Sequence, residues 1–129
     1  MSSRKILFLT LFLAIVAVLL HFSAETFYFY WSYWWFDVLM HFLVGLTGGL
    51  GIYWGLFESG LIFRKRFKLP FVLISVLFCV LAVGLAWEFY EFYFKINNFH
   101  EGYLRDTLND VTLDTAGALL AVALGYKKR

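Results

Sequence analysis

Four long apolar stretches constrain this chain more than any other feature of its sequence. At about 1.5 Å of rise per residue, a helix of about 20 apolar residues crosses the roughly 30 Å hydrocarbon core of a bilayer. We therefore predict an all-α polytopic membrane protein, a bundle of four transmembrane helices that forms a single transmembrane domain over residues 1–129. The predicted spans are residues 6–22, 35–57, 70–94 and 107–126.

The composition favours the same class. The chain is 62% hydrophobic and 16% charged, whereas soluble domains are about 45–50% apolar and about 25% charged. A net charge of +2 is too small to indicate nucleic acid as a partner. Residues 6–22 resemble the apolar part of a signal peptide, but the residues that follow lack a clear cleavage site, which favours a retained first span.

Lysine and arginine residues gather on one side of the predicted bundle. Nine of the eleven lie before the first span, between the second and third, or after the fourth, and the other connecting segments hold Lys95 and Arg105. The positive-inside rule assigns the richer side to the cytoplasm. We therefore predict a multi-pass protein of the plasma (inner) membrane with both termini cytoplasmic.

The segment that joins the first two spans is almost wholly aromatic. All but one of residues 27–36 are Phe, Tyr or Trp. Tyr and Trp favour the headgroup zone of a bilayer, so we predict an interfacial belt or a short helix in the membrane plane. An aromatic platform for a substrate is the alternative interpretation.

Acidic and histidine side chains concentrate where spans two to four enter the outer leaflet. Even on the mildest insertion scale a carboxylate inside a bilayer costs about 2.5–3.5 kcal/mol, so such groups need partners, water or a bound ion. Spacings of three and four residues place them on shared helix faces. We predict that they converge in one outer-leaflet pocket with Asp114 at its floor. The candidate pocket residues are Asp37, His41, Glu88, Glu91, Arg105, Asp106, Asp110 and Asp114.

Simpler interpretations stay open for this set. Asp106 suits the positive end of a helix dipole, Glu91 can reach interfacial water, and the deeper residues can serve only to hydrogen-bond the helices together. If the site is functional, a divalent metal ion is a candidate cofactor, because carboxylates with one imidazole suit Mg²⁺, Mn²⁺ or Zn²⁺. The possible metal ligands are His41, Glu88, Asp110 and Asp114.

Small residues accompany the polar ones on two spans. Gly45 and Gly49 follow His41, and Gly117 follows Asp114. Small residues at such spacing let transmembrane helices approach backbone to backbone. We expect spans two and four to pack closely and to draw their polar faces together.

Three sequence blocks resemble those of VanZ-like membrane proteins. Residues 36–42, Phe-Asp-Val-Leu-Met-His-Phe, resemble the Asp-x-x-x-His-Phe entry to a helix in that family. Residues 110–117 resemble its Asp-x-x-x-Asn-x-x-Gly signature, with Arg105 five residues upstream where the family often has an arginine. Residues 87–91 resemble its Glu-rich third helix, and the same blocks resemble the related YjdF-like inner-membrane proteins.

This resemblance extends over about residues 36–126 and departs from the VanZ-like pattern at two positions. Asp114 stands where VanZ-like proteins usually carry Asn, and Glu91 where Gln is common, which brings the chain closer to the YjdF-like pattern. The resemblance implies a small integral membrane protein of the bacterial cell envelope, and it associates the namesake with glycopeptide (teicoplanin) resistance. It implies no particular reaction.

Three functions are compatible with the predicted pocket. In the first, the pocket binds a lipid headgroup, a cationic ligand or a partner protein without catalysis. In the second, a metal-assisted enzyme acts on a lipid or lipid-linked envelope intermediate, with Arg105 at a phosphate. The third is a proton- or cation-coupled transporter, although Glu58 is the one acid in the cytoplasmic halves of the spans. No nucleophile motif selects the enzyme, and the sequence does not decide the oligomeric state.

Overall fold

The computed structural model describes residues 1–94 and 103–127, and at five helix positions (91, 94, 103, 104 and 106) it describes the backbone alone. Within these residues every regular element is helical. Four helical segments are long and apolar enough to cross a membrane, which confirms the predicted all-α bundle with four transmembrane helices. The elements are α1 (Ser3–Phe27), α2 (Phe29–Ser32), α3 (Trp34–Tyr53), the π-helix η1 (Trp54–Glu58), α4 (Leu69–Phe94) and α5 (Tyr103–Gly125).

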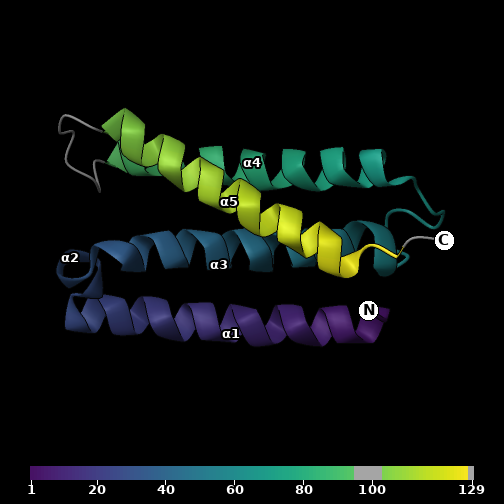
Figure 1. Ribbon diagram of the computed structural model, residues 1–129, viewed down its shortest axis with the longest axis horizontal. Helices are drawn as coiled ribbons and strands as arrows, with labels where there is room; N and C mark the ends of the chain where they lie inside the picture. Colours follow the sequence, from purple (N-terminus) through teal and green to yellow (C-terminus); the bar gives the residue numbers. More distant parts are fainter. Residues whose placement is uncertain (95–102, 128–129) are drawn as a thin grey trace.

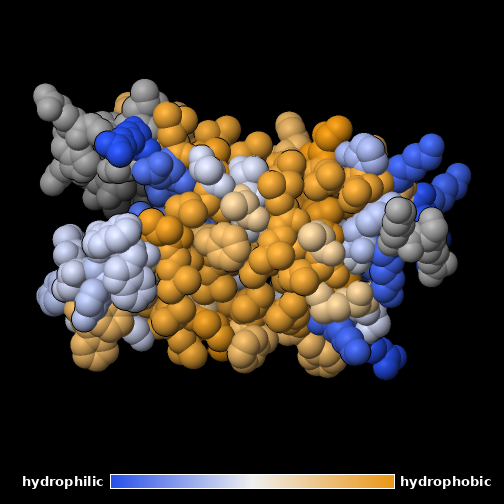
Figure 2. Space-filling view, viewed as in Figure 1, coloured by the Kyte–Doolittle hydropathy of each residue, from blue (hydrophilic) through white to orange (hydrophobic). Residues whose placement is uncertain are grey.

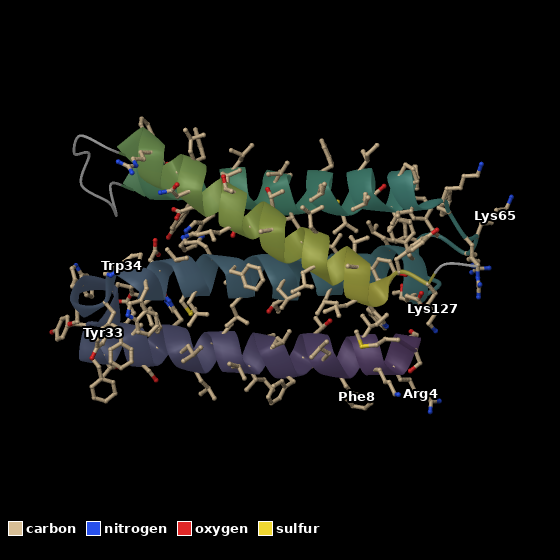
Figure 3. The ribbon with its side chains drawn as sticks, viewed as in Figure 1. Arg4, Phe8, Tyr33, Trp34, Lys65 and Lys127 are labelled. Atoms are coloured by element: carbon tan, nitrogen blue, oxygen red, sulfur yellow. The ribbon has the colours of Figure 1, made fainter. Side chains whose placement is uncertain are left out.

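The four long helices lie side by side and alternate in direction, and α5 crosses α4 and α3 obliquely (Figure 1). Both chain ends and the connection between η1 and α4 lie at one end of the bundle, and α2 lies at the other (Figure 1). Figure 3 places Arg4, Lys65 and Lys127 at the first end, which we call the basic end, and Tyr33 and Trp34 at the opposite end, which we call the α2 end. An even number of spans gives this arrangement, with both termini on one side.

The surface of the bundle is that of a protein solvated by lipid. On the face shown in Figure 2, hydrophobic residues form a band across the middle, and hydrophilic residues gather at the two ends. Large apolar side chains point outward, among them Phe8 (69% exposed) on α1 and Phe78 (71% exposed) on α4. Such exposure would be costly in water over so large an area, but it is the normal state of a helix surface in a bilayer.

The aromatic segment folds into the short helix that the sequence predicts between the first two spans. Tyr28 ends α1 in a left-handed conformation, with φ 59°, and α2 begins at the next residue. The chain then extends at Tyr33 before α3 begins. Phe36 is buried against this turn, with ring centroids 5.2 Å from Tyr30 and 5.5 Å from Phe29. These contacts hold the beginning of α3 against α2, and Phe36 and Met40 also pack in one buried cluster with Ala24 of α1.

Helices α3 and α5 make the most extensive contact in the bundle. A Cβ atom at Gly45 would collide with the backbone of Asp114, and one at Gly117 would collide with the backbone of α3. Farther along, a Cβ at Gly49 would lie 2.8 Å from the Cβ of Ala121. The crossing is therefore backbone to backbone, as small residues permit. It fixes the distance between the polar residues that these two helices carry.

Candidate metal centre

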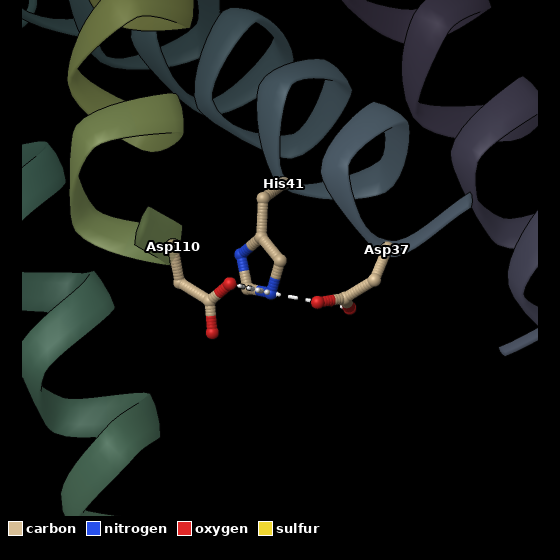
Figure 4. Close-up of side chains that lie close together, drawn as sticks. All are labelled: Asp37, His41 and Asp110. Atoms are coloured by element: carbon tan, nitrogen blue, oxygen red, sulfur yellow. Dashed lines mark ion pairs between the residues drawn. The ribbon is translucent and has the colours of Figure 1, made fainter. Parts of the chain in front are cut away.

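The polar residues of α3 and α5 meet around one imidazole. His41 Nε2 lies 3.5 Å from Asp37 Oδ1 on its own helix and 3.3 Å from Asp110 Oδ1 on α5 (Figure 4). The second ring nitrogen, Nδ1, lies 3.5 Å from Asp114 Oδ1. Asp37 and Asp114 therefore lie on either side of the ring, and Asp110 shares the Nε2 side with Asp37. One histidine and three carboxylates form the cluster.

The four side chains differ in depth. Asp37 is 52% exposed, whereas His41, Asp110 and Asp114 are 20%, 18% and 13% exposed. The cluster is thus accessible at Asp37, which lies in the first turn of α3 beside α2, and it becomes progressively buried toward Asp114. A ligand that reaches the cluster would approach from the α2 end.

The Nε2 side is a candidate position for a metal ion as well as for an ion pair. A charge-assisted N–H···O⁻ bond is about 2.7–2.9 Å long, and both contacts of Nε2 exceed this. Ligands placed tetrahedrally at about 2.0–2.1 Å from a zinc ion lie about 3.3–3.4 Å from one another. The 3.3 Å contact falls within that range, and the 3.5 Å contact is slightly longer. One donor atom from each of Asp37, His41 and Asp110 lies within 4.8 Å of the other two, which makes these three residues a candidate ligand set.

The Nδ1 side fits the same interpretation. Histidine ligands usually donate the N–H of the second ring nitrogen to a carboxylate or carbonyl, which fixes the tautomer and leaves the other nitrogen free for the metal. Asp114 Oδ1 lies 3.5 Å from Nδ1 and would need to move closer to accept such a hydrogen bond. This Oδ1 atom is buried and has no hydrogen-bond partner among the described residues. On its other side α4 approaches closely, since a Cβ at Gly84 would lie 3.2 Å from Asp114 Oδ2.

The other predicted site residues are Glu88, Arg105, Glu91 and Asp106, and the structure describes the side chains of the first two. Glu88 Oε2 accepts a hydrogen bond of 3.3 Å from Thr107 Oγ1, which links α4 to α5 one turn before Asp110. Arg105 is exposed, and no described carboxylate forms an ion pair with it. The side chains of Glu91 and Asp106 lie outside the described residues.

The compact group of donor atoms shares two members, His41 and Asp110, with the predicted metal ligands. The sequence-based set was His41, Glu88, Asp110 and Asp114, whereas the compact group consists of Asp37, His41 and Asp110. Asp37 is the member that the predicted set lacked. Its spacing of four residues from His41 was the signal for it, because this spacing places both residues on one face of α3. Thr107 was not considered, and its spacing of three residues from Asp110 is the corresponding signal on α5.

The hydroxyl of Tyr30 lies close enough to Asp37 for that carboxylate to affect its pKa. Tyr30, in the aromatic turn outside the spans, forms a 2.9 Å hydrogen bond with His21 Nδ1. Burial raises the pKa of the Tyr30 hydroxyl above its usual value, and the carboxylates of Asp37 and Glu25 add to the increase. The phenol therefore stays neutral and presents a hydrogen-bonding group beside the cluster.

The fold and the cluster together define an integral membrane protein of four helices with an acidic and histidine site at one end. The family described as "Predicted membrane protein (DUF2238)" matches residues 4–129, and the chain belongs to this family. Comparison with curated proteins and with solved structures gives no match. The family agrees with the four spans and with a lipid bilayer as the environment. The finer resemblance to VanZ-like and YjdF-like proteins stays a prediction.

Proposed function

We propose that this membrane protein binds a divalent cation through Asp37, His41 and Asp110. The observation that carries the proposal is the spacing around His41 Nε2, where two carboxylate oxygens from two helices lie at 3.3 and 3.5 Å. Two carboxylates and one imidazole suit Zn²⁺ or Mn²⁺. The positive-inside rule would put this end of the bundle in the outer leaflet of the plasma membrane, and the cation would come from outside the cell.

Electrostatics supports a cation at this position. Three carboxylates next to one another, partly removed from water, repel one another and lose hydration. A protonated His41 would offset one of the three negative charges, whereas a divalent ion would offset two and leave the imidazole neutral as a ligand. A bound divalent ion would therefore relieve more of the repulsion between the carboxylates than a protonated His41 would.

Purified protein in detergent, stripped with a chelator, tests the proposal by calorimetric titration with ZnCl₂. One zinc ion per chain should bind and raise the thermal midpoint, because a ligand present at about 100 times its Kd stabilises the folded state by about 2.7 kcal/mol. His41→Ala and Asp110→Asn should abolish both effects. His21→Ala and Glu25→Gln, at the same end but outside the cluster, should retain them. Zinc binding that persists in both cluster variants would refute the proposal.

A second candidate function is a metal-assisted enzyme that acts on a lipid or lipid-linked envelope intermediate. The observation that favours it is the number of protein ligands, since three ligands leave positions open for water and substrate, as in catalytic zinc sites. The exposed Arg105, on the helix that carries Asp110, would contact a phosphate. A zinc-dependent release of phosphate or headgroup from added lipid, lost in Asp110→Asn, would support it. Zinc binding without turnover of any lipid substrate would exclude the enzyme and support cation binding without catalysis.

A further inference from the structure

A polar hollow lies at the basic end of the bundle, far along the helices from His41. Its volume is about 90 Å³, whereas a single water needs about 10–15 Å³ on the same measure. The space therefore suits a group the size of a phosphate with part of its substituent. The polar residues that line it are Tyr53, Glu58, Lys65, Arg66, Tyr126 and Lys127.

The described residues that line this hollow carry a net positive charge. Lys65, Arg66 and Lys127 face a single lining carboxylate, that of Glu58. Among the described residues no carboxylate forms an ion pair with any of the three cations. They come from two segments distant in sequence, the connection after η1 and the end of α5. Among the residues that the structure describes, the lining of the hollow thus carries more positive than negative charge, and an anion would balance it.

Hydrogen bonds fix the carboxylate in this basic surrounding. The π-helix η1 ends at Glu58, whose Oε1 atom accepts a 3.3 Å hydrogen bond from the hydroxyl of Tyr53. Its backbone carbonyl accepts one of 3.3 Å from Ser3 Oγ, and Ser3 Oγ in turn accepts one of 3.1 Å from Trp54 Nε1. Single π turns inside α-helices are frequent at functional sites. Here the turn holds one acceptor beside three cations.

An apolar wall adjoins the cations. The rings of Phe57, Phe63, Phe67 and Phe71 contact one another, with centroids 5.4 Å apart for Phe57 and Phe63 and 4.6 Å apart for Phe67 and Phe71. Phe57 and Phe67 also line the hollow. A free phosphate would use the cations alone. A phospholipid would use both features, since its phosphate meets the cations while its acyl chains follow the apolar helices.

We propose that this hollow binds the headgroup of one anionic phospholipid, with the phosphate between Lys65, Arg66 and Lys127. Basic pockets between transmembrane helices recognise anionic headgroups in this way. Glu58 would accept a hydrogen bond from a headgroup hydroxyl, which favours phosphatidylglycerol. The site is separate from the metal centre, and neither depends on the other.

Lipid retention measured by native mass spectrometry, on protein reconstituted in nanodiscs of equal phosphatidylglycerol and phosphatidylcholine, tests this proposal. One phosphatidylglycerol should stay bound per chain. Lys65→Gln with Arg66→Gln should weaken its binding, by about fivefold for each charge removed. Arg64→Gln with Lys68→Gln removes the same charge from the same connection, but neither residue lines the hollow, so this control should retain the lipid.

Three outcomes would overturn the proposal. Equal loss in both double variants would reduce the effect to attraction between a basic surface and an anionic membrane. Equal retention of both lipids by the native protein would exclude headgroup recognition. Displacement of the lipid by inorganic phosphate at matched concentration would assign the hollow to a free anion. Helix content measured by circular dichroism checks that each variant is folded.

Discussion

Asp114→Asn separates a metal centre from a purely structural cluster. Asp114 Oδ1 lies 3.5 Å from His41 Nδ1, and the side chain is only 13% exposed. If His41 binds the cation through Nε2, the carboxylate of Asp114 sets the tautomer and raises the basicity of the ring. Loss of such a partner typically weakens metal binding 10–100-fold, which corresponds to about 1.4–2.7 kcal/mol.

The same substitution should have the opposite effect on the metal-free protein. Asn occupies the same volume but removes a buried charge that repels Asp110, so stability without metal should be unchanged or higher. If Asp114 serves only as a counter-ion for a protonated His41, its loss should instead destabilise the protein, and by more than a surface change would.

The assay is a zinc titration by calorimetry together with thermal unfolding in detergent, each with and without chelator. Glu25→Gln, an exposed acid at the same end, controls for the general loss of negative charge. Lower metal-free stability combined with unchanged zinc affinity would refute the assignment of Asp114.

Further predictions concern the helix crossing, the proton dependence and the topology. Gly45→Ala should destabilise the protein by about 1–3 kcal/mol in thermal unfolding, because the new Cβ would collide with the backbone of Asp114. Gly48→Ala, with open space around its Cβ, should leave stability unchanged. Equal effects of the two substitutions would contradict the close crossing of α3 and α5. Zinc affinity in calorimetry should fall as pH falls from 7 to 5, because protons compete for His41 Nε2, and a pH-independent affinity would exclude histidine as a ligand. A cysteine added after residue 129 should react with an impermeant maleimide only after the cells are opened, and labelling of intact cells would reverse the proposed orientation.

Hydropathy and residue spacing predicted the helices of the bundle, because helix formation and membrane insertion depend on residues that are close in sequence. Apolar stretches of spanning length became the four long helices, and the aromatic segment became the short helix α2. The ends of the helices were harder to predict, because hydropathy reports the length of the apolar stretch and not the length of the helix. Helix α1 extends to Phe27, past Ser23 and Glu25, since polar residues can continue a helix beyond the apolar stretch at a small cost.

The composition of the cluster could be predicted only in part. Spacing placed Asp110 and Asp114 on one face of α5, and Asp37 with His41 on one face of α3. Which carboxylate lies nearest the imidazole depends on the angle and closeness of the α3–α5 crossing, and single-sequence spacing carries neither. Glu88, expected among the ligands, accepts a hydrogen bond from Thr107 and is not in the compact group of donor atoms. The π turn at Trp54–Glu58 had no sequence signal either.

X-ray absorption at the zinc edge, on protein loaded with one equivalent of zinc, tests the proposed metal centre most directly. A shell of one nitrogen and two carboxylate oxygens from the protein, at about 2.0–2.2 Å and with the rest from water, is the expected result. His41→Ala should remove the imidazole scattering from the spectrum. A sulfur shell at about 2.3 Å, which would implicate Cys79, or zinc that is lost on simple dialysis, would contradict a centre built from Asp37, His41 and Asp110.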